Sequence, residues 1–184
     1  MTQTAGRLPS TDARDAAERV FRELQHGEPI YAVLDGARDR RIRGWVLDSR
    51  APSWCLYRGE LPPALESAAP WLLRLLPGQP YTERFFGAGW QNAWGILLAS
   101  SAPSRQLRQH LRRFFVVRTD DRKRLLFRYY DPRVLRVYLP TCTPEEVAQF
   151  FGPISTMVAE GEEPGAFHVF RRSENGLDHR RIEA

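Results

Sequence analysis

Two kinds of apolar pattern alternate along the chain and predict interspersed helices and strands. Between Ala13 and His26 apolar residues recur every three or four positions, which is helical spacing, and Gly27 ends the pattern. Near-continuous apolar runs, typical of buried strands, follow at Ile30–Leu34, Trp54–Tyr57, Trp71–Leu76 and Trp94–Ser100. Short helices are expected at Arg40–Leu47 and Tyr81–Phe86, with a Pro- and Ala-rich connection at Pro62–Ala69.

The second half of the chain carries clear helix-start signals. Pro103 and Ser104 open a helix whose buried stripe is Leu107, Leu111 and Phe114. The pairs Asp131-Pro132 and Thr143-Pro144 each place a capping side chain before a proline at the first helical position. Two hairpins are also predicted, 115–118 with 124–130 and 154–159 with 166–170.

Interspersed strands and helices favour the α+β class, with mixed α and β structure in one compact domain. We expect a central mixed sheet flanked by helices, with a strand order that the sequence does not specify. The expected organisation is a flexible N-terminus at 1–12, a domain at 13–172 and a polar C-terminal tail at 173–184.

Composition narrows the partner classes. The 184 residues carry a formal net charge of +5, and Lys123 is the only lysine among 27 cations. The arginines are spread along the chain and mixed with 22 acids, with no run of five like charges. We therefore expect no nucleic-acid partner, although a basic nucleic-acid-binding module remains an alternative.

Location and redox state follow from what the sequence contains. It shows neither an apolar stretch of about 20 residues nor a secretory signal pattern, so we expect a cytoplasmic protein without membrane insertion. Cys55 and Cys142 stand far apart in apolar surroundings, which predicts buried free thiols. We expect no bound metal ion or other cofactor.

Sequence motifs of catalysis are not found. Phe86-Gly87-Ala88-Gly89-Trp90 lacks the third glycine of the dinucleotide fingerprint and is interpreted as a turn. The four histidines are isolated in sequence, and arginines flank His110, which should lower its pKa. We predict a protein that is not an enzyme. The alternative is an unfamiliar active site around Arg128, Asp131, Arg133 and His110.

The segment from Phe127 to Val134 is the densest cluster of polar and aromatic groups. In a structural interpretation Asp131 caps a helix, and Arg128 or Arg133 pairs with a carboxylate. In the alternative, strand alternation places Arg128 and Tyr130 on one face, where with Arg133 they recognise a partner.

The helix from Ser104 to Phe114 carries basic residues over much of its exposed side. A solvated face, a docking surface for an acidic partner and a membrane or nucleic-acid surface all fit this pattern. The candidate partner-binding residues are Arg128, Tyr130, Asp131, Arg133, Arg108 and Arg112.

Seven sequence blocks, in order, resemble the effector-adaptor (chaperone) family of type VI secretion, first catalogued as a domain of unknown function. The blocks are Tyr31–Ala37, Leu56–Gly59, Ala69–Leu73, Trp94-Gly95, His110–Arg112, Leu126–Val134 and Phe150–Ile154. The resemblance covers about Ile30 to Phe170 and is most specific at Phe127-Arg128-Tyr129-Tyr130-Asp131-Pro132-Arg133.

The resemblance implies a bacterial cytoplasmic adaptor that binds a cognate effector and loads it onto the spike protein without catalysis. Many relatives carry a longer C-terminal region that helps to hold the cargo, whereas this sequence stops soon after the common domain. Aromatic anchors suit such a role. Most of the tryptophans (Trp45, Trp54, Trp71, Trp90 and Trp94) are expected in the core, with one or two exposed.

Overall fold

The computed structural model describes residues 11–24, 27–118 and 123–183. A seven-stranded sheet lies at its centre, in the order β2-β3-β1-β4-β7-β8-β9. Its strands are β1 (Ile30–Asp35), β2 (Ser53–Cys55), β3 (Pro70–Leu75), β4 (Gly95–Ala99), β7 (Thr156–Glu160), β8 (Phe167–Ser173) and β9 (Gly176–Ile182). The α+β prediction is confirmed. The strand pairs are all antiparallel, so the expected mixed sheet is corrected to an antiparallel one.

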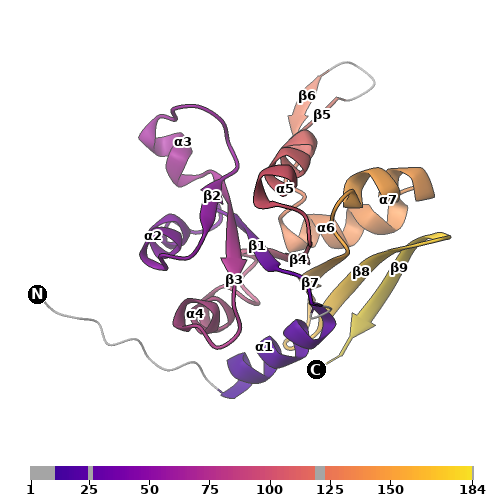
Figure 1. Ribbon diagram of the computed structural model, residues 1–184, viewed down its shortest axis with the longest axis horizontal. Helices are drawn as coiled ribbons and strands as arrows, with labels where there is room; N and C mark the ends of the chain where they lie inside the picture. Colours follow the sequence, from indigo (N-terminus) through magenta and orange to yellow (C-terminus); the bar gives the residue numbers. More distant parts are fainter. Residues whose placement is uncertain (1–10, 25–26, 119–122, 184) are drawn as a thin grey trace, which may run out of the picture.

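Helices cover both faces of this sheet (Figure 1). On one face lie α1 (Thr11–Leu24), α2 (Arg41–Asp48) and α4 (Pro80–Ala88), and on the other lie α5 (Ser104–Leu111), α6 (Pro132–Tyr138) and α7 (Pro144–Phe151). The short α3 (Pro63–Ser67) buries none of its side chains. The 3₁₀ turns η1 (Arg112–Phe114) and η2 (Leu139–Thr141) follow α5 and α6.

The two helical layers explain the continuous apolar runs. In β1, Ile30, Ala32 and Leu34 pack in the core beneath α1, α2 and α4. Tyr31 and Val33 pack in the second core, beneath α5, α6 and α7. Since neighbouring residues of a strand point to opposite faces, a strand covered on both faces is apolar at nearly every position.

The predicted caps are also in place. The Asp131 side chain accepts a hydrogen bond from the Arg133 backbone N–H at the start of α6. At the start of α7, Thr143 and Glu146 exchange the reciprocal hydrogen bonds of a capping box. These local signals fix where two helices of the second layer begin.

The chain ends in a strand where the sequence predicted a polar tail at 173–184. β9 pairs with β8 along its whole length, from Ser173↔Gly176 to Phe167↔Ile182. The prediction was wrong because β9 is an edge strand, whose side chains are mostly exposed and therefore polar. Its apolar side chains Leu177 and Ile182 pack against the cores, and His179 stacks on Phe170 with ring centroids 4.5 Å apart. At the other end, α1 already begins at Thr11, and residues 1–10 lie outside the described part.

A second, two-stranded sheet stands apart from the main one (Figure 1). It consists of β5 (Val116–Arg118) and β6 (Arg124–Leu126), hereafter the ribbon. Its register is Val116↔Leu126, Val117↔Leu125 and Arg118↔Arg124. β6 is shorter than the predicted strand 124–130, because the chain turns at Tyr129 and Tyr130 before α6. Within the described residues, no helix is long and apolar enough to span a bilayer.

Candidate functional site

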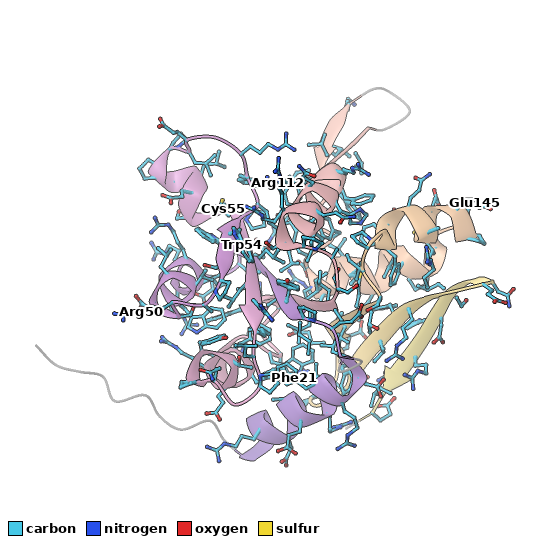
Figure 2. The ribbon with its side chains drawn as sticks, in the orientation of Figure 1. Phe21, Arg50, Trp54, Cys55, Arg112 and Glu145 are labelled. Atoms are coloured by element: carbon cyan, nitrogen blue, oxygen red, sulfur yellow. The ribbon has the colours of Figure 1, made fainter. Side chains whose placement is uncertain are left out.

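The candidate arginines Arg108, in α5, and Arg112, the first residue of η1, lie against β2, an edge strand of the main sheet. The guanidinium carbon of Arg108 lies 5.3 Å from the centroid of the Trp54 ring, a cation–π arrangement. Arg112 donates from Nε to the Leu56 carbonyl (2.7 Å) and from Nη2 to the Cys55 carbonyl (3.1 Å). Figure 2 shows Arg112 beside Trp54 and Cys55. Arg112 thus ties the chain leaving β2 to the end of α5.

Burial and neighbouring cations both act on Arg112. Partial burial lowers the pKa of its guanidinium, and Arg108 and Arg58 lower it further. Four of the five tryptophans are buried, as expected, and Trp54 is half-buried against the second core, so none of the five is a fully exposed anchor. Trp54 and Arg108 therefore form the accessible part of this contact.

The second group of candidates forms a corner, defined here by Asp35, Arg128, Tyr130, Asp131 and Arg133. Asp35, at the end of β1, is 1% exposed and accepts a hydrogen bond from Nη2 of Arg128. Asp35 also accepts from the backbone N–H of Ala37 (3.1 Å). The hydrogen bond to Asp35 raises the pKa of Arg128. The Arg128 side chain thus connects the β6–α6 segment to the end of β1.

Arg133 and Asp131 form the outer pair of the corner. Arg133 donates from Nε to Oδ1 of Asp131 (2.9 Å) and from Nη2 to Oδ2 (2.6 Å), a bidentate contact. Burial raises the pKa of Asp131, but the hydrogen bonds from Arg133 outweigh burial and hold this pKa below its usual value. The cap of α6 is therefore ionised and held by its own helix.

Tyr130 does not lie on a recognition surface. It is 1% exposed, and Phe115 packs edge-on against it at 5.9 Å. The prediction assumed a strand through Tyr130, but β6 ends at Leu126, so strand alternation does not apply. Tyr129 and Tyr130 are consecutive, and both are buried. Burial, followed by the charge of Asp35, raises the pKa of Tyr130 above its ordinary value.

His110 is a buried residue of the second core. Its Nε2 lies 2.8 Å from the Phe150 carbonyl, and a Cβ at Gly152 would lie only 2.2 Å from its Cε1. Burial lowers the pKa of His110, the Phe150 carbonyl opposes this, and Arg113 lowers it further. None of these contacts joins His110 to Arg128, Asp131 or Arg133. Its observed contacts are those of a packing residue.

The ribbon is the feature that sequence reasoning missed. The described part of the chain exposes eight large apolar side chains, and four of them lie here: Val116, Val117, Leu125 and Leu126. The sequence predicted the hairpin but did not place its apolar side chains at the surface.

Two comparisons found nothing similar: neither the curated proteins nor the solved structures contain a match. A third comparison, with protein families, matched residues 30–149 to the family described as "Domain of unknown function (DUF4123)". The matched region holds the corner, the ribbon and the contact of Arg112 with β2. Because the match covers more than half of the 184 residues, the chain belongs to the DUF4123 family.

Proposed function

We propose that this protein is a non-catalytic adaptor, which binds a cognate type VI secretion effector in the bacterial cytoplasm and loads it onto the spike protein. The observation that supports the proposal is the family membership over residues 30–149. Six of the seven blocks that resemble the effector adaptors begin within this range. The family description itself names no activity, so the adaptor role comes from the resemblance.

The candidate residues and the ribbon divide two roles between them. Arg128 and Arg133 each contact a carboxylate of the same chain, and Arg112 contacts backbone carbonyls. These groups stabilise the fold. The ribbon, in contrast, presents apolar side chains to solvent, which is a usual property of protein interaction surfaces.

The mechanism needs two simultaneous contacts and no chemistry. An adaptor that holds the effector at one surface and the spike at another makes their encounter intramolecular. The effective concentration of one at the other then rises to about the millimolar range. Loading follows from affinity alone, without a nucleotide, metal ion or other cofactor.

The proposal predicts effector and spike genes beside this one, and the test is reconstitution with the two proteins that they encode. We expect the purified chain to co-elute with that effector in size-exclusion chromatography and to form a ternary complex once the spike is added. An unrelated effector from another gene cluster serves as the control. Failure to bind either neighbouring protein, or turnover of a small molecule by the purified chain, would contradict the proposal.

A further inference from the structure

We propose that the ribbon is the surface that binds the effector, and that it takes an extended apolar segment which also carries acidic residues. This inference rests on the proposed adaptor function and assigns that function to named residues. Of the two partners in the proposal, the effector is assigned to this surface and the spike is not.

The ribbon exposes apolar side chains on both of its faces. Leu125 and Leu126 are 50% and 55% exposed, and Val116 and Val117 are exposed as well. The register pairs Val116 with Leu126 and Val117 with Leu125. Because side chains alternate along a strand, one apolar pair lies on each face of the ribbon. A partner can therefore pack against either face.

The base of the ribbon is anchored in the core. The Phe127 backbone N–H donates to the Phe115 carbonyl (2.9 Å), which continues the pairing beyond Val116 and Leu126. Phe115 is buried and stacks on Tyr129, with ring centroids 5.8 Å apart. Phe127 packs edge-on against Tyr138 of α6 at 4.7 Å. The base belongs to the core, so the exposed residues are held in a defined position.

The backbone of the ribbon has two open edges. β5 and β6 pair only with each other among the described strands, so each has an outer edge that no described strand covers. Such an edge accepts an added strand, a common mode of binding an extended peptide. Main-chain hydrogen bonds would supply affinity, and the apolar side chains would select alternate residues of the partner segment. An extended segment is therefore the shape that fits.

The sequence in and next to the ribbon is basic. The sequence from Arg112 to Leu126 contains six cations (Arg112, Arg113, Arg118, Arg122, Lys123 and Arg124) and two acids (Asp120 and Asp121), so its net charge is positive. Arg113 and Lys123 are exposed. A second copy would bring a like-charged ribbon against this one, which is unfavourable. An acidic segment is complementary, so the occupant is a partner protein and not another copy of the chain.

The experiment measures binding of the purified full chain to the purified effector encoded beside its gene, by isothermal titration calorimetry. The test variant is Leu125→Thr with Leu126→Thr, which removes apolar area and keeps a residue suited to a strand. We expect the dissociation constant to rise at least about tenfold. The matched control is Leu47→Thr on α2, where Leu47 is 47% exposed on the other side of the sheet, and it should change binding less than about twofold.

A second pair of variants tests the charge argument. Arg113→Glu should weaken effector binding and reduce the dependence of binding on salt concentration, because it reverses a charge next to the ribbon. Arg84→Glu, at an exposed position of α4, is the control and should bind like the wild type. Circular dichroism melting of all four variants confirms that each one is folded.

Each outcome separates this inference from the proposed function. If the wild type binds the effector and the ribbon variants bind it equally well, the ribbon assignment is wrong and the adaptor function stands. If the variants lose the spike but keep the effector, the choice of partner is wrong. A wild-type dimer that the ribbon variants dissociate would overturn the charge argument. Wild type that binds no neighbouring effector would overturn the adaptor function itself.

Discussion

Four of the five corner residues follow the ribbon directly in the sequence, but the side chains of the corner and the ribbon have opposite environments. In the corner, the cations contact carboxylates of the same chain, and Tyr130 is buried. In the ribbon, four apolar side chains are exposed. The polar candidate residues are engaged within the fold, whereas the apolar residues of the ribbon face solvent. Residue type alone therefore does not tell which side chains are accessible.

The difference follows from how strongly each kind of group destabilises the folded state when it has no partner. A buried carboxylate such as Asp35 must be paired, because the unpaired charge would be strongly destabilising in the interior. Exposed apolar area has no comparable internal requirement, and contiguous apolar patches on a surface commonly mark binding sites. The comparison predicts that changes in the corner alter stability, whereas changes in the ribbon alter binding.

The largest expected effect is on stability, in the corner. Asp35→Asn removes the carboxylate that Arg128 contacts and leaves that side chain without its counter-charge. We expect the free energy of unfolding to fall by about 3 kcal/mol, at the low end for a broken buried pair because Arg128 is partly exposed. Urea denaturation followed by tryptophan fluorescence measures this change.

The control for Asp35 is another Asp–Arg contact of the same chain. Asp39 accepts hydrogen bonds from Arg41, an exposed residue. Asp39→Asn should lower the free energy of unfolding by less than about 1 kcal/mol. Equal effects of the two substitutions would show that the corner is not a buried structural pair, and the comparison with the ribbon would fail.

The second largest expected effect is a pH dependence of the free energy of unfolding, which arises from Glu160, the buried carboxyl at the end of β7. Its oxygens accept the backbone N–H groups of Gln91 (2.6 Å) and Ala93 (2.8 Å), two residues with positive φ. Burial raises the pKa of Glu160 to about 7, although hydrogen bonds from Ala93 and Gln91 partly oppose this. Glu160 therefore extends the class of internally engaged polar groups beyond the corner.

The sign of the effect follows from proton binding. Between pH 4.5 and 7 the folded state keeps a proton on Glu160 that the unfolded state releases, so stability falls as pH rises through this window. We expect a loss of about 2 kcal/mol from pH 5 to pH 7. Denaturation across this range should show a smaller slope for Glu160→Gln. Glu162→Gln, at a mostly exposed carboxyl, should keep the wild-type slope, and a wild-type slope in Glu160→Gln would contradict the assignment.

The elements of the fold were largely predictable, because their signals are local. A continuous apolar run such as Ile30–Leu34 identifies a strand covered on both faces, and Asp131 before Pro132 identifies a helix start. The partner strands were not predictable, since antiparallel order depends on contacts that are distant in sequence. β9 was missed for a related reason: an exposed edge strand carries no apolar run.

The candidate site was predictable only in part. The pairing of Arg133 with Asp131 involves residues two positions apart, and the structural interpretation anticipated it. The contact of Arg128 with Asp35 spans 93 positions, and the contacts of Arg112 with 55–57 span 55 to 57 positions. Burial of Tyr130 depends on where β6 ends, which no local pattern marks. Long-range contacts therefore decided which candidates remained accessible.

The smallest expected effect is at Arg133, and it is the most direct test of the comparison. Arg133 is the most exposed of the corner side chains. In its ion pair with Asp131, the guanidinium is at the surface and the carboxylate is buried. Arg133→Gln should lower the free energy of unfolding by about 1 kcal/mol. The buried Asp131 loses its bidentate partner, but the Arg133 end of the pair is screened by solvent, and the cap hydrogen bond from the Arg133 backbone N–H and the charge of Arg128 remain. If the corner serves only the fold, capture of the neighbouring effector in a pull-down should stay within about twofold of the wild type. A folded Arg133→Gln or Arg133→Glu variant that loses capture would instead place recognition at the corner. The ribbon would then be at most one part of a larger interface.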